Sequence, residues 1–322
     1  VSWSAHTGGP LNYLLTLQDC AGNAISIPIA YTSLDVPESA DFGPPDPAGA
    51  DAVGGGVRIT NGNVFKRIDI ADLPTPNRLG LGLALYYNSR PTALNSFAYG
   101  WTHTYAASLT SESAPDGQAR VHIQDATGRS VFFAGGSSFQ PLYNEPSSLV
   151  FVDGQYIWQR IDGSRCGFGI NGRLQWMQDS VGNRLEMTYA DGLLVLVSDL
   201  ASGRMLTFTY EDGSIAAVTG PATPSVPDGV LAAFTYDDYG NLVSVTRADG
   251  SAVECFYTDS ADPNNLTRLE DGSGTVLAQW SYDSLDRAVN SRLADDTGVS
   301  VDYAGADTVT VTDAYGMERT YA

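Results

Sequence analysis

A spacing of 21 residues recurs in the second half of the chain. Three pairs of tyrosines keep this spacing: Tyr189 with Tyr210, Tyr236 with Tyr257, and Tyr282 with Tyr303. Glycines keep a shorter step of 10 or 11 residues, at Gly182, Gly192, Gly203 and Gly213. Each unit therefore holds a strand, a tight turn, a returning strand and a second turn, with about seven residues per strand. The repeat predicts stacked hairpins, because a single hairpin cannot bury its apolar face alone.

Turn-forming dipeptides extend this pattern beyond the repeats. Asp-Gly and Asn-Gly tolerate the positive φ of tight hairpin turns. They begin at Asn61, Asp116, Asp153, Asp162, Asn171, Asp191, Asp212, Asp228, Asp249 and Asp271. From Val57 onward, strand-like segments follow one another at roughly 8–12 residues, and no stretch keeps a helical apolar period over three turns. The sequence predicts an all-β protein.

The chain is strongly acidic, with 17 basic and 37 acidic side chains and a net charge of −20. A surface of this sign lacks the basic face that phosphate binding requires, so we expect no nucleic-acid partner. No apolar run approaches the 18 or so residues of a membrane span, so we expect no transmembrane segment. The opening VSWSAHTGGP carries no visible signal peptide, which suggests a larger polypeptide with flanking domains.

Composition divides the chain into four parts. Residues 1–35 hold two alternating strands around a turn, and they resemble the last hairpin of an immunoglobulin-like bacterial surface domain. Residues 36–56 form a linker rich in Pro and Gly. Residues 57–175 are expected to form a β-rich leading domain, and residues 176–322 carry the hairpin repeats.

Motifs in both of the larger parts resemble one family. The segment FTYDDYGNLVSVTRADGSAVECFY at 234–257 closely resembles the YD repeat of the Rhs family. The segments LALYYNSR at 83–90, YGWTHTY at 99–105 and DATGRSVFF at 125–133 resemble the domain that precedes YD repeats in Rhs and wall-associated proteins. The resemblance covers about residues 54–322. It implies an Rhs-associated β-rich domain that leads into a spiral sheet of YD hairpins.

The repeat residues have a structural interpretation. Each tyrosine is expected to pack over the aromatic ring of its neighbour while its hydroxyl finds a polar partner. Asp is expected to accept backbone N–H groups in the turn, and Gly supplies the left-handed conformation. A row of exposed tyrosines that binds sugar is the alternative. The predicted repeat positions are Tyr189, Asp191, Gly192, Tyr210, Asp212, Gly213, Tyr236, Asp237, Gly240, Asn241, Tyr257, Tyr282, Asp283 and Tyr303.

The leading domain has its own predicted motif positions. His103 is expected to pack between strands, and Arg90 to pair with a carboxylate inside the fold. Trp101, Trp158, Trp176 and Trp280 are expected in the core, with glycan stacking as the alternative. The full set of motif positions is Asn88, Arg90, Gly100, Trp101 and His103.

Catalytic and metal-binding patterns are sparse. His6, His103 and His122 show no metal-ligand spacing, and no nucleophile elbow, P-loop or dinucleotide fingerprint occurs. We therefore predict no catalytic residue, no cofactor and no enzymatic activity. Calcium is the one metal considered, at the Asp237-Asp238 and Asp295-Asp296 turns, which otherwise serve as solvated turns.

The three cysteines do not fix a disulfide framework. Cys20, Cys166 and Cys255 are far apart and have no metal spacing. Buried or incidental thiols are expected, and a bridge of the Cys20–Cys166 kind is the alternative.

Two functions are considered, of which the first follows from the resemblance and the second from the hairpin at residues 11–34 and the open end of the repeats. The first is a non-enzymatic scaffold or shell segment of a secreted or cell-surface bacterial Rhs protein, as part of a polymorphic-toxin carrier. The second is a surface adhesin without a toxin, which binds a glycan or assembles with a neighbouring subunit by strand addition. A glycan-active enzyme is a third hypothesis, but no carboxylate pair stands out among the 29 Asp and 8 Glu residues.

Overall fold

This computed structural model describes residues 10–18, 24–32, 52–73, 79–90, 97–113, 119–136, 138–143, 145–303 and 308–321. The chain divides into two compact units, Val1–Glu38 and Ser39–Ala322. In the first unit, β1 (Pro10–Gln18) and β2 (Ala24–Thr32) pair in antiparallel register. His6, Cys20 and residues 36–51 of the predicted linker lie outside the described residues.

The protein is all-β, as the sequence predicted. No helix in the described ranges is long and apolar enough to cross a membrane. The second unit begins with five strands that form two small sheets. The strands β3 and β4 form a hairpin, and β5, β6 and β7 form a three-stranded sheet, which we name the inner sheet. Their bounds are β3 (Ala52–Val53), β4 (Val57–Arg58), β5 (Phe65–Leu73), β6 (Leu81–Asn88) and β7 (Trp101–His103).

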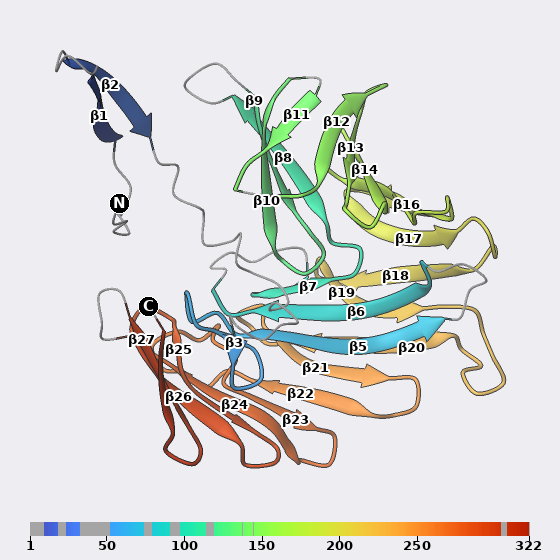
Figure 1. Ribbon diagram of the computed structural model, residues 1–322. Helices are drawn as coiled ribbons and strands as arrows, with labels where there is room; N and C mark the ends of the chain where they lie inside the picture. Colours follow the sequence, from blue (N-terminus) through green and yellow to red (C-terminus); the bar gives the residue numbers. More distant parts are fainter. Residues whose placement is uncertain are drawn as a thin grey trace. The chain divides into compact units, whose positions relative to one another are not determined.

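The remaining strands form one large antiparallel sheet, in which each strand from β8 to β27 pairs with the strand that follows it (Figure 1). We name it the hairpin sheet. It begins at Ser108, so it runs across the predicted boundary at residues 175–176. Its strands are β8 (Ser108–Ser113), β9 (Ala119–Gln124), β10 (Ser130–Gly135), β11 (Ser138–Pro141), β12 (Ser148–Val152), β13 (Gln155–Gln159), β14 (Arg165–Gly169), β15 (Leu174–Gln178), β16 (Arg184–Ala190), β17 (Leu193–Asp199), β18 (Met205–Glu211), β19 (Ser214–Thr219), β20 (Val230–Tyr236), β21 (Leu242–Arg247), β22 (Ala252–Phe256), β23 (Arg268–Asp271), β24 (Val276–Tyr282), β25 (Ala288–Leu293), β26 (Gly298–Asp302), β27 (Val309–Asp313) and β28 (Glu318–Tyr321).

The first strands of the hairpin sheet curl back on themselves. Ser108 at the start of β8 forms an antiparallel bridge with Arg173, which follows the β14–β15 turn. The backbone N–H of Leu109 donates to the carbonyl of Gly172 at 2.8 Å. Gly172 has φ +77°, and a Cβ there would lie 1.9 Å from the carbonyl oxygen of Leu109. Only glycine therefore allows this close approach.

The Asp-Gly turns fall into two conformational kinds. At Asp153, Asp191 and Asp212 both the aspartate and the following glycine have positive φ. This is the primed turn that matches the twist of paired strands. At Asp162 and Asp249 only the glycine has positive φ, and the carboxylate accepts the N–H two residues ahead. The same dipeptide thus closes both two-residue and longer turns.

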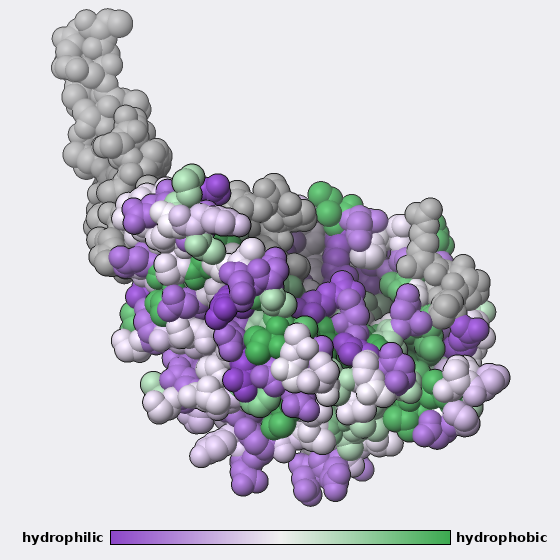
Figure 2. Space-filling model, turned by 90° about the horizontal axis from the view of Figure 1, so that it is seen from below, coloured by the Kyte–Doolittle hydropathy of each residue, from purple (hydrophilic) through white to green (hydrophobic). Residues whose placement is uncertain are grey.

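Alternation along each strand separates a buried face from an exposed one. In β18, Leu206 and Phe208 are buried, whereas Met205, Thr207 and Thr209 are exposed. The buried face of the hairpin sheet packs on the inner sheet, which lies beside β18–β20 in Figure 1. Hydrophilic and apolar side chains are intermixed on the face seen in Figure 2.

Candidate functional site

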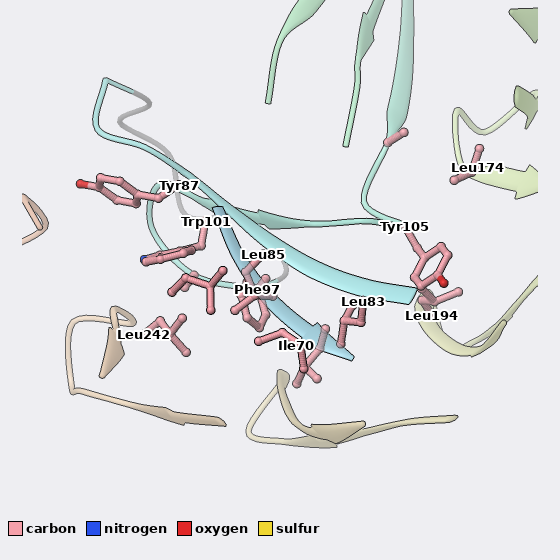
Figure 3. Packing of buried hydrophobic residues seen from close by; sticks show 14 of the residues in the cluster. Ile70, Leu83, Leu85, Tyr87, Phe97, Trp101, Tyr105, Leu174, Leu194 and Leu242 are labelled. Carbon is pink, nitrogen blue, oxygen red and sulfur yellow. The ribbon is translucent and has the colours of Figure 1, made fainter. Parts of the chain in front are cut away.

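The inner sheet docks on the hairpin sheet through a row of aromatic side chains. Trp101 and Phe97 are buried, and the ring of Trp101 lies 5.1 Å from that of Tyr87. Phe97 meets the rings of Phe234 and Tyr236 edge-on, at 5.5 and 6.0 Å between centroids. Figure 3 shows Tyr87, Phe97 and Trp101 grouped in this core. Aromatic residues of the leading domain therefore fill the concave side of the repeats.

Hydrogen bonds join the two parts at the same place. The indole N–H of Trp101 donates to the hydroxyl of Tyr257 at 2.9 Å. The backbone N–H of Leu266 donates to the hydroxyl of Tyr87 at 3.0 Å. A backbone bond also runs from the N–H of Ala288 to the carbonyl of Gly62 at 3.0 Å. Two positions predicted from separate motifs, Trp101 and Tyr257, thus meet directly.

The motifs of the leading domain converge on Asn88. Its Nδ2 donates to the carbonyl of Thr127 at 2.8 Å, and its Oδ1 accepts from Nδ2 of Asn63 at 2.9 Å. Gly100 has φ +69°, and a Cβ there would lie 2.6 Å from the carbonyl oxygen of Asn88. Nη1 of Arg90 donates to the carbonyl of Leu285, so this arginine contacts the repeats through their backbone.

The six repeat tyrosines bind backbone carbonyls in one regular way. Each hydroxyl donates to a carbonyl at the start of an earlier strand or within two residues of it, at 2.7–3.1 Å. The donor and acceptor pairs are Tyr189 to Leu174, Tyr210 to Leu194, Tyr236 to Ile215, Tyr257 to Leu242, Tyr282 to Leu266, and Tyr303 to Ala288. The row of hydroxyls therefore links successive hairpins.

The tyrosine rings do not stack on one another among the described aromatic contacts. Guanidinium groups lie over two of them instead: Arg173 over Tyr189 at 5.6 Å and Arg287 over Tyr303 at 4.4 Å. Burial raises the pKa of Tyr189 and of Tyr303 to about 12. The hydroxyls therefore keep their protons and remain donors. The hydroxyls thus have the polar partners that the sequence suggested, while guanidinium groups, and not neighbouring tyrosine rings, lie over two of the rings.

The Tyr-Asp positions organise the longer turns. Oδ1 of Asp237 accepts the backbone N–H groups of Tyr239 and Asn241 at 3.0 and 2.9 Å, and Oδ2 accepts Nδ2 of Asn241 at 2.9 Å. Gly240 has φ +82° in the same turn. Asp283 repeats the arrangement, with Arg287 in place of the asparagine. Asp191 and Asp212, in contrast, sit in tight turns and carry positive φ themselves.

His103 is buried between the two sheets. Its ring lies 5.9 Å from that of Phe97 and 5.9 Å from that of Phe208. Burial lowers its pKa to about 4, so the ring is neutral near pH 7. Its Nδ1 accepts the backbone N–H of Tyr105 at 3.3 Å.

A second histidine forms a pair with a serine that the sequence did not predict. Nε2 of His122 lies 2.7 Å from Oγ of Ser130, and Nδ1 lies 3.5 Å from Oγ1 of Thr110. Ser130 is buried, and the third group is a hydroxyl, not the carboxylate of a catalytic triad. The sequence could have indicated this pair only through the pairing of β9 and β10, the neighbouring strands on which His122 and Ser130 lie.

Cysteines and acidic turns add structural contacts. Cys166 and Cys255 are free, buried thiols, and burial raises the pKa of both; Cys20 lies outside the described residues.

At the calcium candidates, Asp295 accepts from the N–H and hydroxyl of Thr297, and Asp296 pairs with Arg292. Within the described ranges, no group of three or more His, Cys, Asp or Glu side chains is placed to hold a metal ion.

Three further indoles are buried. Trp158 donates to Oγ of Ser147 at 2.6 Å, and Trp176 donates to Oε1 of Gln155 at 3.2 Å. Trp280 is also buried, and Nζ of Lys66, the only lysine, lies 5.1 Å from its ring. Nζ of Lys66 also donates to the carbonyl of Gly55 at 2.6 Å, and burial lowers its pKa to about 8.

Comparison with known proteins gives one family match and several relatives. Residues 54–133 match the family described as "Domain of unknown function (DUF6531)". The tRNA3(Ser)-specific nuclease WapA of Bacillus spizizenii is 30% identical over 187 residues, which are 57% of this chain and 8% of that protein. The double-stranded DNA deaminase toxin A of Burkholderia cenocepacia is 26% identical over 235 residues, 65% of this chain and 15% of that protein. The chain thus spans a small part of each relative.

These relatives correct one prediction. The sparse catalytic patterns of the sequence predicted a protein without enzymatic activity. The relatives are named as nucleases, including the tRNA nuclease WapA of Bacillus subtilis strain 168, and as a DNA deaminase toxin. The prediction that this is not an enzyme is therefore wrong by that comparison.

Solved structures show weaker likeness. The crystal structure of TcdB2-TccC3-Cdc42 aligns with a TM-score of 0.34 and 11% identity, over 63% of this chain and 13% of that chain. A porin-like protein from Bacteroides uniformis aligns with a TM-score of 0.24 and 13% identity, over 67% of this chain and 93% of that chain. The family match and the WapA-type relatives support an Rhs/YD-repeat-related family for this chain.

Proposed function

We propose that this chain is a carrier scaffold within a toxin-related, Rhs-like bacterial protein that is secreted or displayed at the cell surface. The hairpin sheet supplies the wall, and the inner sheet fixes its curvature from the concave side. The observation that carries the proposal is the docking of Phe97 and Trp101 on the repeats, through ring contacts with Phe234 and Tyr236 and the bond to Tyr257.

The relatives support the toxin part of this proposal. They are named as enzymes that act on tRNA or on double-stranded DNA. The net charge of −20 opposes contact between this chain and phosphate groups. The proposal therefore assigns to the chain the holding of a toxin, and not the recognition of the toxin's nucleic-acid target.

The test compares two variants of the complete protein. Phe97→Leu loosens the docking of the inner sheet, whereas Thr207→Ala changes an exposed side chain of β18 and serves as control. We expect Phe97→Leu to expose residues 52–107 to protease and to change secretion, or activity on tRNA or double-stranded DNA, several-fold. Loosened docking with unchanged production, secretion and activity would contradict the carrier role.

A second function, glycan binding, is favoured by one feature of the outer face. A hollow of about 750 Å³ lies over β23–β27 and the segment that follows β22. Hydroxyl and amide side chains line it, including Thr267, Gln279, Ser281, Asn290, Ser300 and Thr312. Such groups hydrogen-bond sugar hydroxyls. A glycan array probed with the chain, and with the Asn290→Ala/Ser300→Ala variant, tests this function; binding that the variant leaves unchanged, or no binding at all, contradicts it.

A further inference from the structure

A separate cavity of about 160 Å³ lies where the hairpin sheet curls back on itself. It is bounded by the start of β8, the β14–β15 turn and the first strands of the repeats. Leu174 and Leu194, seen near Tyr105 in Figure 3, form part of its apolar wall. A water molecule occupies roughly 30 Å³ in the liquid, so the cavity has room for a group of several heavy atoms.

The polar groups of this cavity share one property: they include two nitrogen donors and no acid. His103 and Arg173 line it, together with the hydroxyls of Tyr189 and Tyr210, and no Asp or Glu is among the lining residues. Both tyrosine hydroxyls already donate to carbonyls of Leu174 and Leu194. An acidic ligand would therefore meet donors and no competing carboxylate.

His103 presents an unused donor at the buried end. The side chain is 4% exposed. Because Nδ1 accepts the N–H of Tyr105, the neutral ring carries its proton on Nε2. No residue in the described part of the chain accepts that proton. Nε2 is not one of the fully buried, unpartnered polar atoms of the described residues, so this N–H is open to the cavity that His103 lines, where a ligand acceptor can meet it.

Arg173 presents an unused charge at the exposed end. Its guanidinium lies over the ring of Tyr189 and makes no ion pair with any described residue. Six other arginines of the described residues each pair with a carboxylate: Arg67, Arg129, Arg184, Arg268, Arg287 and Arg292. Nη2 of Arg173 also lies 2.8 Å from the position that a Cβ on Gly192 would take, so the glycine leaves space for the guanidinium.

We propose that this cavity binds one carboxylate group, which the guanidinium of Arg173 and the Nε2–H of His103 receive together. A planar guanidinium matches the two oxygens of a carboxylate. One fixed positive charge with one neutral donor suits a monoanion better than a phosphate dianion. The carboxylate belongs either to a free small acid or to an acidic side chain of a peptide. The site does not depend on the carrier role.

The test follows the ring signals of His103 by NMR in the full chain. The probes are sodium acetate and a peptide with blocked ends and one glutamate, with sodium chloride at equal ionic strength and the matching glutamine peptide as references. We expect a saturable shift with acetate, with the glutamate peptide, or with both. A response to acetate alone assigns a small acid, and a response to the peptide alone assigns a peptide.

Arg173→Gln and Arg319→Gln form the matched pair of variants, since Arg319 is exposed in β28 away from the cavity. Thermal unfolding establishes that both variants fold. Arg173→Gln is expected to weaken binding about tenfold or more, because it removes a charged hydrogen bond. Arg319→Gln is expected to bind as the unaltered chain. The proposal fails if neither probe shifts the His103 signals beyond chloride, or if Arg173→Gln binds with unchanged affinity.

Discussion

The indole of Trp101 donates to the hydroxyl of Tyr257, and that hydroxyl donates in turn to the carbonyl of Leu242 at 3.0 Å. Trp101 is completely buried. One hydroxyl therefore completes two hydrogen bonds, one to the leading domain and one within the repeats. Tyr257 alone among the six repeat tyrosines accepts from an indole in this way among the described contacts.

Tyr257→Phe is expected to lower the free energy of unfolding by about 2 kcal/mol, because it leaves a buried N–H and a carbonyl without partners. Urea unfolding measures the loss. Tyr303→Phe is the control, since its hydroxyl bonds only the carbonyl of Ala288 among the described contacts, and about 1 kcal/mol is expected. Equal losses in the two variants would contradict the bridging role of Tyr257.

Gly154 and Gly172 have the same φ of +77°. Replacing each by alanine therefore separates the free-energy cost of backbone strain from the cost of a steric clash. A Cβ on Gly154 would meet no heavy atom within 4 Å, whereas a Cβ on Gly172 would collide with the carbonyl of Leu109. Gly154→Ala is expected to cost about 1–2 kcal/mol from the left-handed conformation alone. Gly172→Ala is expected to cost more, because it also forces β8 away from the β14–β15 turn. Thermal unfolding measures the loss of stability in each variant. Similar losses would show that β8 does not approach the β14–β15 turn as closely as the structure has it.

Neighbouring aspartates test the role of the turn carboxylates. Asp237→Ala removes the acceptor of three hydrogen bonds and is expected to destabilise the fold by about 1–2 kcal/mol. Asp238→Ala changes an exposed side chain in the same turn and is expected to have almost no effect. Chemical unfolding of both variants gives the comparison. A larger loss for Asp238→Ala would reverse the assignment.

Acid is expected to weaken the docking of the inner sheet. Burial holds the pKa of His103 at about 4 in the folded chain, against an ordinary value of 6.5. The unfolded chain therefore binds a proton first, and stability present above pH 6.5 is lost as the pH falls toward 4. The difference corresponds to about 3 kcal/mol. Unfolding free energies of the unaltered chain and of His103→Gln between pH 7 and pH 4.5 test this. The unfolding free energy of the unaltered chain should fall more steeply with decreasing pH than that of the variant. Parallel curves would contradict the role of His103.

The all-β fold could be predicted from the sequence because strand alternation and turn dipeptides are local signals. Turn roles for Asp237 and Gly240 follow from the same local chemistry. The bond between Trp101 and Tyr257 spans 156 residues and depends on how the sheet curves, which no local pattern encodes. A polar partner for each repeat tyrosine was expected, and the hydroxyls do bind carbonyls of earlier strands, but the expected stacking of neighbouring tyrosine rings is absent from the described aromatic contacts. The sequence did not indicate a ligand-binding role for Arg173, because an arginine that follows an Asn-Gly turn ordinarily faces solvent.

Hydrogen exchange of the full chain, resolved by residue, tests whether the inner sheet and the repeats form one interlocked structure. We expect the amides of β5 and β6 to open together with those of β20–β25, with the N–H groups of Leu266 and Ala288 protected to a similar degree. Faster exchange of β5 and β6 by orders of magnitude, while the repeat strands stay protected, would show that the two parts are not interlocked.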